Sequence, residues 1–198
     1  MIRLFPALLV IALVSLVPPA LRAESEIYGG VGIGYSTFTV DASKLRSIGV
    51  GTGFEASGIT TRQFVGYRYG EYTGLELGYI NFGTLRDQVG YQSGEGSLNY
   101  SIKTSGYDLA VIGRYPLDPE LAVFGKLGLI RWDSIGTLET FPQSTSSSGD
   151  DLIWGLGLDY RGSNRFHVRL QADFVDIQFA NSWWVLTTSV MYGFPLGR

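Results

Sequence analysis

Apolar and polar residues alternate along most of this chain with the two-residue period of an extended strand. The segment 165–175 shows the pattern most clearly, because one face is apolar and the other is polar or charged. Its apolar face carries Phe166, Val168, Leu170, Ala172 and Phe174, and its polar face carries His167, Arg169, Gln171 and Asp173. A half-exposed sheet would explain this segment alone, but similar segments recur along the chain.

The alternation predicts eight strands. Their approximate ranges are 27–40, 59–69, 72–83, 107–115, 121–132, 152–160, 165–175 and 184–194. Short connections, such as Gly70-Glu71 and the proline-containing turn 116–119, alternate with longer polar loops at 41–58, 84–104 and 134–149. Arg131 interrupts the apolar face of its segment, and we interpret this as a strand that has left the lipid or as a bulge.

The repeated apolar face predicts an all-β fold, an eight-stranded antiparallel up-and-down transmembrane barrel with an apolar outside and a polar inside. Short periplasmic turns and longer extracellular loops are typical of such barrels in the bacterial outer membrane. A soluble lipocalin-like ligand binder would have the reverse orientation, which alternation alone does not distinguish. The content of charged residues, only 17%, favours lipid on the outside.

The outward aromatic residues fall into two groups according to their distance from the predicted turns, as two interfacial belts require. The periplasmic belt consists of Tyr67, Tyr115, Tyr160, Phe166, Tyr192 and Phe194. The outer belt consists of Tyr35, Tyr79, Tyr107, Phe174 and Trp184.

Charged residues on the inward faces lie at two depths. Counted from the turns, Glu76, Lys126 and Arg169 lie four or five residues into their strands, with Asp159 slightly lower, so we expect these four to form a lumenal ion-pair cluster. A second lumenal layer is expected from Arg62, Asp108 and Asp173. Buried charges need partners, and an eight-stranded barrel is filled by side chains, so the simplest role of these pairs is to fill and hold the interior.

Residues 1–23 are expected to be a cleaved signal peptide and residues 24–198 the barrel domain. Arg3 precedes an apolar run over 4–17, which is shorter than the roughly 20 residues of a membrane-spanning helix. Pro18-Pro19 ends the run, and Ala23 is a suitable cleavage residue. Cleavage would change the formal net charge from −3 to −5, because it removes two arginines and no acid. Such a chain is not expected to bind nucleic acid.

Three pieces of the chain resemble the OmpA-type eight-stranded outer-membrane barrels. They are Ile27-Tyr-Gly-Gly-Val-Gly-Ile-Gly-Tyr-Ser36, Gly66-Tyr-Arg-Tyr-Gly-Glu-Tyr-Thr-Gly-Leu-Glu-Leu-Gly-Tyr79 and the terminal Val190-Met-Tyr-Gly-Phe194. The resemblance covers essentially the whole predicted barrel domain. It implies an ion-pair network that plugs the lumen and that has been proposed to act as a gate.

The resemblance maps an inward Glu of the third strand onto Glu76, an inward acid of the sixth strand onto Asp159 and an inward Arg of the seventh strand onto Arg169. The family's lumenal Lys of the fourth strand falls on Ile112. This chain departs from the family there, and Lys126 or Arg114 is expected to supply the missing charge.

The resemblance implies a structural or surface-interaction role with at most weak, gated conductance. Partners are expected to be the lipid bilayer and lipopolysaccharide, an unidentified ligand of the extracellular loops, and the outer-membrane assembly machinery, which would read the pattern of Val190, Tyr192 and Phe194. We expect a monomer.

A lipid A-modifying enzyme is an alternative, because some eight-stranded barrels carry a Ser, a His and an acid at the outer rim. The single His, His167, is expected at the periplasmic end, which is the wrong depth for that chemistry. We therefore expect no enzyme and no catalytic residue. The chain has no Cys and only one His, so no disulfide, cofactor or metal site is expected.

Overall fold

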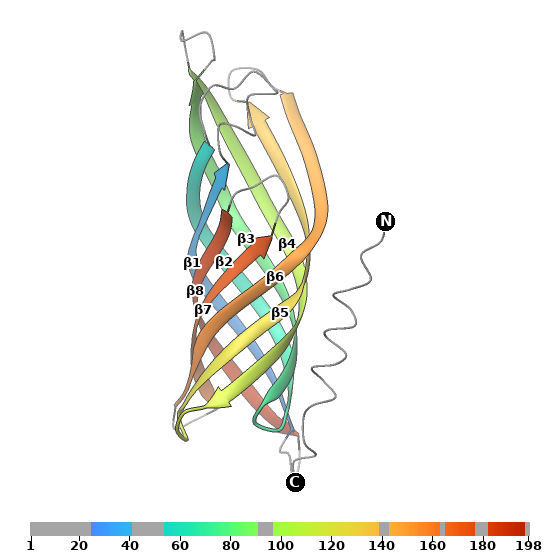
Figure 1. Ribbon diagram of the computed structural model, residues 1–198, viewed down its shortest axis with the longest axis vertical. Coiled ribbons are helices and arrows are strands. Elements are labelled where there is room, and N and C mark those ends of the chain that lie inside the picture. The colour runs from blue at the N-terminus through green and yellow to red at the C-terminus, as the bar shows by residue number, and fades with distance from the viewer. Residues whose placement is uncertain are drawn as a thin grey trace.

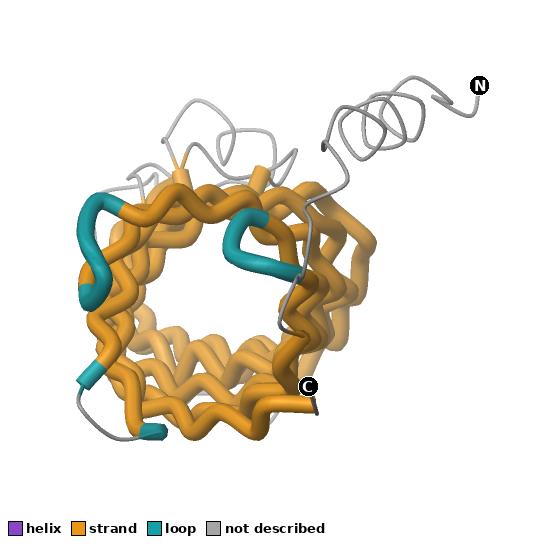
Figure 2. Tube along the Cα trace, turned by 90° about the horizontal axis from the view of Figure 1, so that it is seen from below, coloured by secondary structure: helices purple, strands orange, loops and turns teal. Residues whose placement is uncertain are grey.

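The computed structural model describes residues 25–40, 54–90, 97–138, 143–162, 165–176 and 182–196, so the predicted signal peptide lies outside the described residues. Within these ranges the chain forms a closed antiparallel barrel in which each strand pairs with its neighbours in sequence and β8 pairs with β1 (Figures 1 and 2). The strands are β1 Ser25–Val40, β2 Phe54–Tyr69, β3 Thr73–Gly90, β4 Ser97–Pro116, β5 Leu121–Leu138, β6 Gln143–Arg161, β7 Phe166–Asp176 and β8 Ser182–Leu196. The predicted eight-stranded up-and-down barrel is confirmed.

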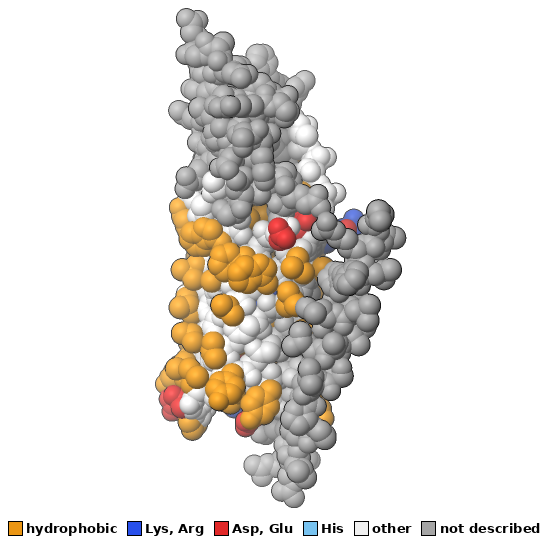
Figure 3. All heavy atoms as spheres, viewed as in Figure 1, with side chains coloured by type: hydrophobic (Ala, Val, Ile, Leu, Met, Phe, Trp, Pro, Cys, Tyr) orange, Lys and Arg blue, Asp and Glu red, His pale blue; other side chains and the backbone are white. Residues whose placement is uncertain are grey.

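The apolar face of the barrel points outward, as predicted. Val31, Ile59 and Leu129 are each more than 60% exposed, whereas the alternate positions on the same strands are buried or half-buried. Hydrophobic side chains cover much of the visible face of the barrel wall (Figure 3). This is the reverse of a soluble lipocalin-like binder, which keeps its apolar residues inside. No helix in the described part of the chain is long and apolar enough to cross a membrane.

Two of the three predicted long loops are largely strand, so these predictions are wrong. The segment 84–104 contains the end of β3 and the start of β4, which pair from Thr84↔Lys103 to Gly90↔Ser97. The segment 134–149 contains the end of β5 and the start of β6, which pair out to Leu138↔Gln143. Figure 1 shows β3 to β6 rising beyond the other strands. Beyond the lipid a strand needs no apolar face, so its composition resembles that of a loop while its backbone hydrogen bonds continue.

The third predicted loop, 41–58, is partly strand as well, because β2 begins at Phe54. Its first part, 41–53, lies outside the described residues.

The break in alternation at Arg131 is not a bulge. The register of β5 with β6 runs without a shift through Leu129↔Leu152 and Arg131↔Asp150. The Arg131 side chain points outward, is 71% exposed, and lies 3.8 Å from Asp150.

A register shift occurs instead on β3, between Asn81 and Thr84. Gly83 takes a positive φ of 81° there, and a Cβ at this position would collide with the carbonyl oxygen of Ile59. The shift turns Leu85 to the inside, next to Phe82, whereas strict alternation would place it outside.

Aromatic side chains contact one another within each of the two predicted belts. Tyr192 packs against Phe166 and Phe194, with ring centroids 5.0 Å and 4.7 Å away. Tyr79 and Tyr107 lie 4.9 Å apart. The remaining predicted belt residues, Tyr67, Tyr115, Tyr160, Tyr35, Phe174 and Trp184, are exposed or half-buried on the outward faces of their strands.

Candidate functional site

The predicted lumenal charges all point into the barrel and are buried, each no more than 3% exposed. They come from six consecutive strands: Arg62 on β2, Glu76 on β3, Asp108 on β4, Lys126 on β5, Asp159 on β6, and Arg169 and Asp173 on β7. We call this set, together with Arg114 of β4, the ionic region.

Arg169 occupies the centre of the cluster predicted with it. Its Nε and Nη2 donate to the two carboxylate oxygens of Asp159 at 2.7 and 3.2 Å. Its Nη1 donates to Oε2 of Glu76 at 2.6 Å. Asp159 is the direct cross-strand neighbour of Arg169, which aligns the carboxylate with the guanidinium. Such bidentate pairs are among the strongest charge-assisted hydrogen bonds in proteins.

Arg62 joins the two predicted layers into one network. Its Nη2 donates to Oε1 of Glu76 and to Oδ2 of Asp108, both at 3.1 Å. Its Nη1 donates to Oδ2 of Asp173 at 3.3 Å. Glu76 therefore bridges two guanidinium groups, one from β2 and one from β7.

Lys126 pairs differently from the sequence prediction. The prediction grouped it with Glu76 and Arg169, but its Nζ lies 2.6 Å from Oδ2 of Asp108 and 3.8 Å from Oδ1 of Asp173. Asp173 also accepts hydrogen bonds from Nε2 of Gln171 at 2.7 and 2.6 Å. The structure thus places Lys126 with the second layer. The long lysine side chain reaches neighbours that its depth along the strand does not reveal.

The charges of the ionic region balance. Arg114, which the sequence offered as an alternative source of positive charge, lies with its Nε 3.8 Å from Oδ2 of Asp159. With it, four cations face four carboxylates; the cations are Arg62, Arg114, Lys126 and Arg169, and the acids are Glu76, Asp108, Asp159 and Asp173. Buried charges persist only when they are paired in this way.

Three inward aromatic residues surround the Arg169 guanidinium, and sequence reasoning gave them no role. Its Cζ lies 4.3 Å from the ring centroid of Phe124, 5.1 Å from that of Phe64 and 5.7 Å from that of Tyr28. The Tyr28 hydroxyl also donates to Oε2 of Glu76 at 3.2 Å. Tyr28, Phe64 and Phe124 fall on the inward positions of their strands by alternation, and that signal could have found them.

One glycine leaves room for the network. A Cβ at Gly78 would lie 2.5 Å from Oδ1 of Asp108 and 2.8 Å from Nη2 of Arg62. Any larger residue on this inward position of β3 would push those two groups apart. Glycine at position 78 therefore allows Arg62 and Asp108 to meet.

At the turn end of the lumen, Arg68 of β2 donates from Nη1 to Oε2 of Glu26 on β1 at 2.5 Å. This pair was not predicted. His167 lies at the same end, on the inward face of β7, and is 4% exposed. It is the direct cross-strand neighbour of Arg161 and Met191.

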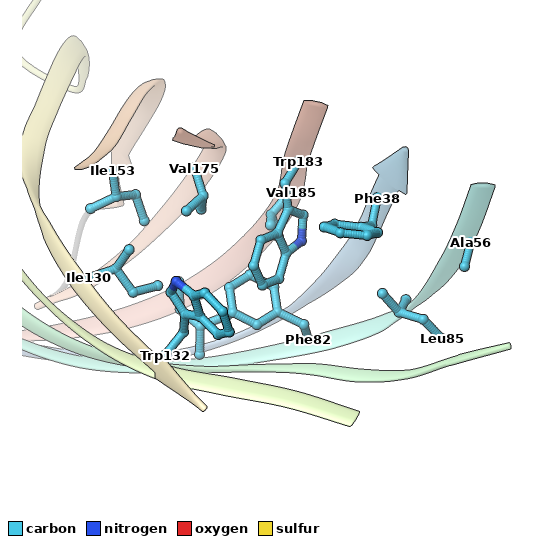
Figure 4. Packing of buried hydrophobic residues seen from close by; sticks show 11 residues of the cluster. Phe38, Ala56, Phe82, Leu85, Ile130, Trp132, Ile153, Val175, Trp183 and Val185 are labelled. Carbon is cyan, nitrogen blue, oxygen red and sulfur yellow. The ribbon is translucent and has the colours of Figure 1, made fainter. Parts of the chain in front are cut away.

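Toward the loop end the inside of the barrel is apolar, and the expectation of a polar inside did not include this filling. We call this cluster the apolar region; it consists of Phe38, Ala56, Ile80, Phe82, Leu85, Ile130, Trp132, Ile153, Val175, Trp183 and Val185 (Figure 4). Phe82 and Trp183 pack with ring centroids 4.1 Å apart. An eight-stranded barrel has to be filled by side chains, and apolar ones fill it here.

Solved structures with the same fold as this chain include small outer-membrane barrels. OprG from Pseudomonas aeruginosa superposes with a TM-score of 0.59 at 17% identity, over 87% of this chain and 97% of that one. Neisserial surface protein A gives 0.57 at 11% identity, over 85% and 97%. Ail of Yersinia pestis, solved in complex with the heparin analogue sucrose octasulfate, gives 0.55 at 16% identity, over 86% and 99%. At these identities the likeness shows the fold.

Sequence comparison defines the family. The outer membrane protein A of Serratia marcescens is 30% identical over 117 residues, which are 57% of this chain and 31% of that protein. The chain thus matches about a third of the length of that relative. The family model of the OmpA-like transmembrane domain matches residues 22–181. The chain therefore belongs to the OmpA-like transmembrane domain family and is a β-barrel of the bacterial outer membrane.

Proposed function

We propose that this protein is a structural and surface-contact barrel whose lumen is closed by the ionic region, with at most weak, gated conductance. The observation that carries the proposal is the continuity of the network from β2 to β7 through Arg62, Glu76 and Arg169. Each charge in it is directed at another side chain and removed from water. An ion or a sugar that crosses the lumen would have to break these pairs, and a broken buried pair leaves a charge uncompensated.

Liposome swelling tests the closed lumen. The chain is refolded into phospholipid vesicles, and uptake of a five-carbon sugar is followed by light scattering. Wild type is expected to admit the sugar no faster than protein-free vesicles. The double variant Glu76→Ala with Arg169→Ala is expected to admit it several times faster.

The matched control is Arg131→Ala with Asp150→Ala, which also removes one cation and one anion but from an exposed outward pair. It should swell like wild type. Folding of each variant is checked by its altered gel migration before boiling. Rapid swelling of the wild type, or equal swelling of the two double variants, would refute closure by the ionic region.

The surface-contact role rests on the extension of β3 to β6 beyond the rest of the barrel (Figure 1). Residues 144–148 of β6 are exposed serines and a threonine, paired with β5. Replacing them with alternating Thr and Gly should leave folding and swelling unchanged while altering any cell or ligand attachment. Unchanged attachment in a strain that depends on the protein for it would remove this part of the proposal.

The C-terminal strand is the proposed signal for the outer-membrane assembly machinery. Val190 and Phe194 point outward and are about half exposed, and β8 pairs with β1 to close the barrel. Phe194→Ala is expected to lower the amount of folded protein in the outer membrane, with Leu186→Ala, outward on the same strand, as control. Equal amounts of folded protein for the two variants would argue against this signal.

The enzyme alternative has its own test. His167, the residue it would need, lies inside the barrel at the turn end. Mass spectrometry of lipid A from cells with and without the protein is expected to give identical acyl patterns. A difference abolished by His167→Ala would establish the enzyme instead.

A further inference from the structure

A small cavity of about 40 Å³ lies within the apolar region at the loop end of the lumen. Its walls include the aromatic side chains of Phe38, Trp132 and Trp183, and its polar groups are the hydroxyls of Thr104 and Ser134. None of the lining side chains carries a charge. The cavity is therefore suited to a neutral, mostly apolar molecule, and water would find few partners in it.

The two tryptophans of this cavity differ in their hydrogen bonding. The indole Nε1–H of Trp132 donates to Oδ2 of Asp151 at 2.7 Å. The indole of Trp183 is buried, only 3% exposed, yet its Nε1–H meets no hydrogen-bond acceptor among the described residues. In Figure 4 its nitrogen lies on the side of the Phe38 ring, which stands 5.5 Å away at an interplanar angle of 87°. A ring face is a weak substitute for an oxygen or nitrogen acceptor.

An unmet donor in a dry site costs free energy, which a ligand acceptor would recover. The hydroxyls of Thr104 and Ser134 share a hydrogen bond at 2.9 Å, and among the side chains that line the pocket the Trp183 indole nitrogen is the buried polar atom without a hydrogen-bond partner. We propose that this pocket binds one end of a small neutral apolar molecule that carries a single hydrogen-bond acceptor, placed on the Trp183 indole N–H between aromatic walls.

The surroundings of the pocket indicate how a molecule would enter it. Ile102 and Ser134 are only partly buried, so a molecule would enter on their side. In the opposite direction the lumen leads to the ionic region, which makes the pocket a blind one that binds rather than conducts. An engineered apolar cavity that holds benzene has a volume of roughly 150 Å³, so here only the acceptor end of a molecule would enter, and the rest would project toward the loop end.

The pocket is independent of the closed lumen proposed above. Its test uses ¹⁵N-labelled protein in nanodiscs of dimyristoyl phosphatidylcholine, titrated with benzonitrile and separately with toluene. The two probes are close in size, but only benzonitrile has an acceptor. The chain has four tryptophans, and each indole N–H resonance is assigned by single replacement with Phe. Trp184, the next residue, faces outward and reports partitioning into lipid.

Benzonitrile is expected to move the Trp183 indole resonance downfield in a saturable manner, while the Trp184 resonance changes only linearly. Toluene should give no downfield movement at Trp183. Two filling variants, Ser134→Leu and Thr104→Leu, should each weaken the benzonitrile affinity at least tenfold. If either variant does not fold, the other is used, and the comparison of the two probes on wild type stands without them. Parallel responses of Trp183 and Trp184, or equal responses to both probes, would overturn the proposal.

Discussion

The ionic and apolar regions of the lumen share the strands β2, β3, β5, β6 and β7, and the side chains of both are buried, yet the two regions are held together by different forces. In the ionic region, Arg169 and Arg62 reach their carboxylates at 2.6 to 3.3 Å, and each contact depends on orientation. In the apolar region, Phe82, Trp183 and their neighbours fill space by shape. The difference teaches that a barrel interior must be filled and neutral, but it does not have to be polar.

The order of the two regions is the same along the strands. On β7, Arg169 and Asp173 precede Val175 toward the loop end, and on β5, Lys126 precedes Ile130. The apolar region therefore covers the ionic region on the loop side. It limits the access of water to the charges, and a low local dielectric strengthens their attraction.

The largest expected effect comes from breaking the ionic region at its centre. Arg169→Ala leaves Glu76 and Asp159 without a main partner, and the loss of one member of a buried pair typically costs about 3–5 kcal/mol. Urea unfolding in phospholipid vesicles would measure the free energy of unfolding of the variant and of the wild type. Arg131→Ala, which removes an exposed arginine 3.8 Å from its acid, should cost at most about 1 kcal/mol. Similar losses in the two variants would mean that the network contributes no more than a surface pair.

The stability of the barrel should fall when a side chain of the apolar region loses volume. Ile130 is fully buried, and Ile130→Ala is expected to cost about 2–5 kcal/mol through lost contacts and a cavity. Leu129→Ala is the control on the adjacent outward position, where lipid can fill the space. The same unfolding measurement should give a clearly smaller loss for Leu129→Ala. An equal or larger loss there would show that this part of the lumen is loosely packed.

Double-mutant cycles sharpen the division between the regions. Glu76 and Arg169 touch, so their coupling energy is expected to lie at about 0.5–3 kcal/mol. Val175 lies six residues beyond Arg169 on β7, roughly 20 Å along the strand at about 3.3 Å per residue. Unfolding of Arg169→Ala, Val175→Ala and the double variant should therefore be additive within about 0.5 kcal/mol. Strong coupling between Arg169 and Val175 would indicate that the two regions behave as one energetic unit.

The smallest expected effect is the change in the stability cost of each variant with salt concentration. At 1 M salt the screening length is about 3 Å, so the small cost of Arg131→Ala should disappear. The cost of Arg169→Ala should stay nearly constant between low and high salt, because the side chains of that network are excluded from solvent. The free energies of unfolding of wild type and both variants, measured at 0.05 and 1 M NaCl, would compare the two costs. A strongly salt-dependent cost for Arg169→Ala would indicate that water and ions reach the network.

Alternation predicted the barrel and the inward position of the charges of the ionic region, because lipid imposes a strict two-residue pattern on the wall, and the low content of charged residues predicted its orientation. It failed wherever that constraint ends. The upper parts of β5 and β6 have no lipid to face, so Ser144 and its neighbours resembled a loop although they pair in register. Leu85 points inward only because Gly83 permits a register shift.

Contacts inside the lumen were harder to predict than positions. Depth along the strand groups Lys126 with Glu76, but the reach of its side chain brings it to Asp108. Phe38 and Val185 lie on inward faces by alternation, yet nothing in the alternation tells an apolar filling from a polar one. Which inward residues meet depends on strand tilt and stagger, which are properties of the closed barrel.

The most direct test of the account is single-channel recording in planar bilayers with Glu76→Ala and Phe82→Ala. Each variant truncates one inward residue of β3, the first in the ionic region and the second in the apolar region. We predict frequent openings for Glu76→Ala and the quiet trace of the wild type for Phe82→Ala. Openings in Phe82→Ala with a quiet Glu76→Ala would contradict the claim that the ionic region closes the lumen.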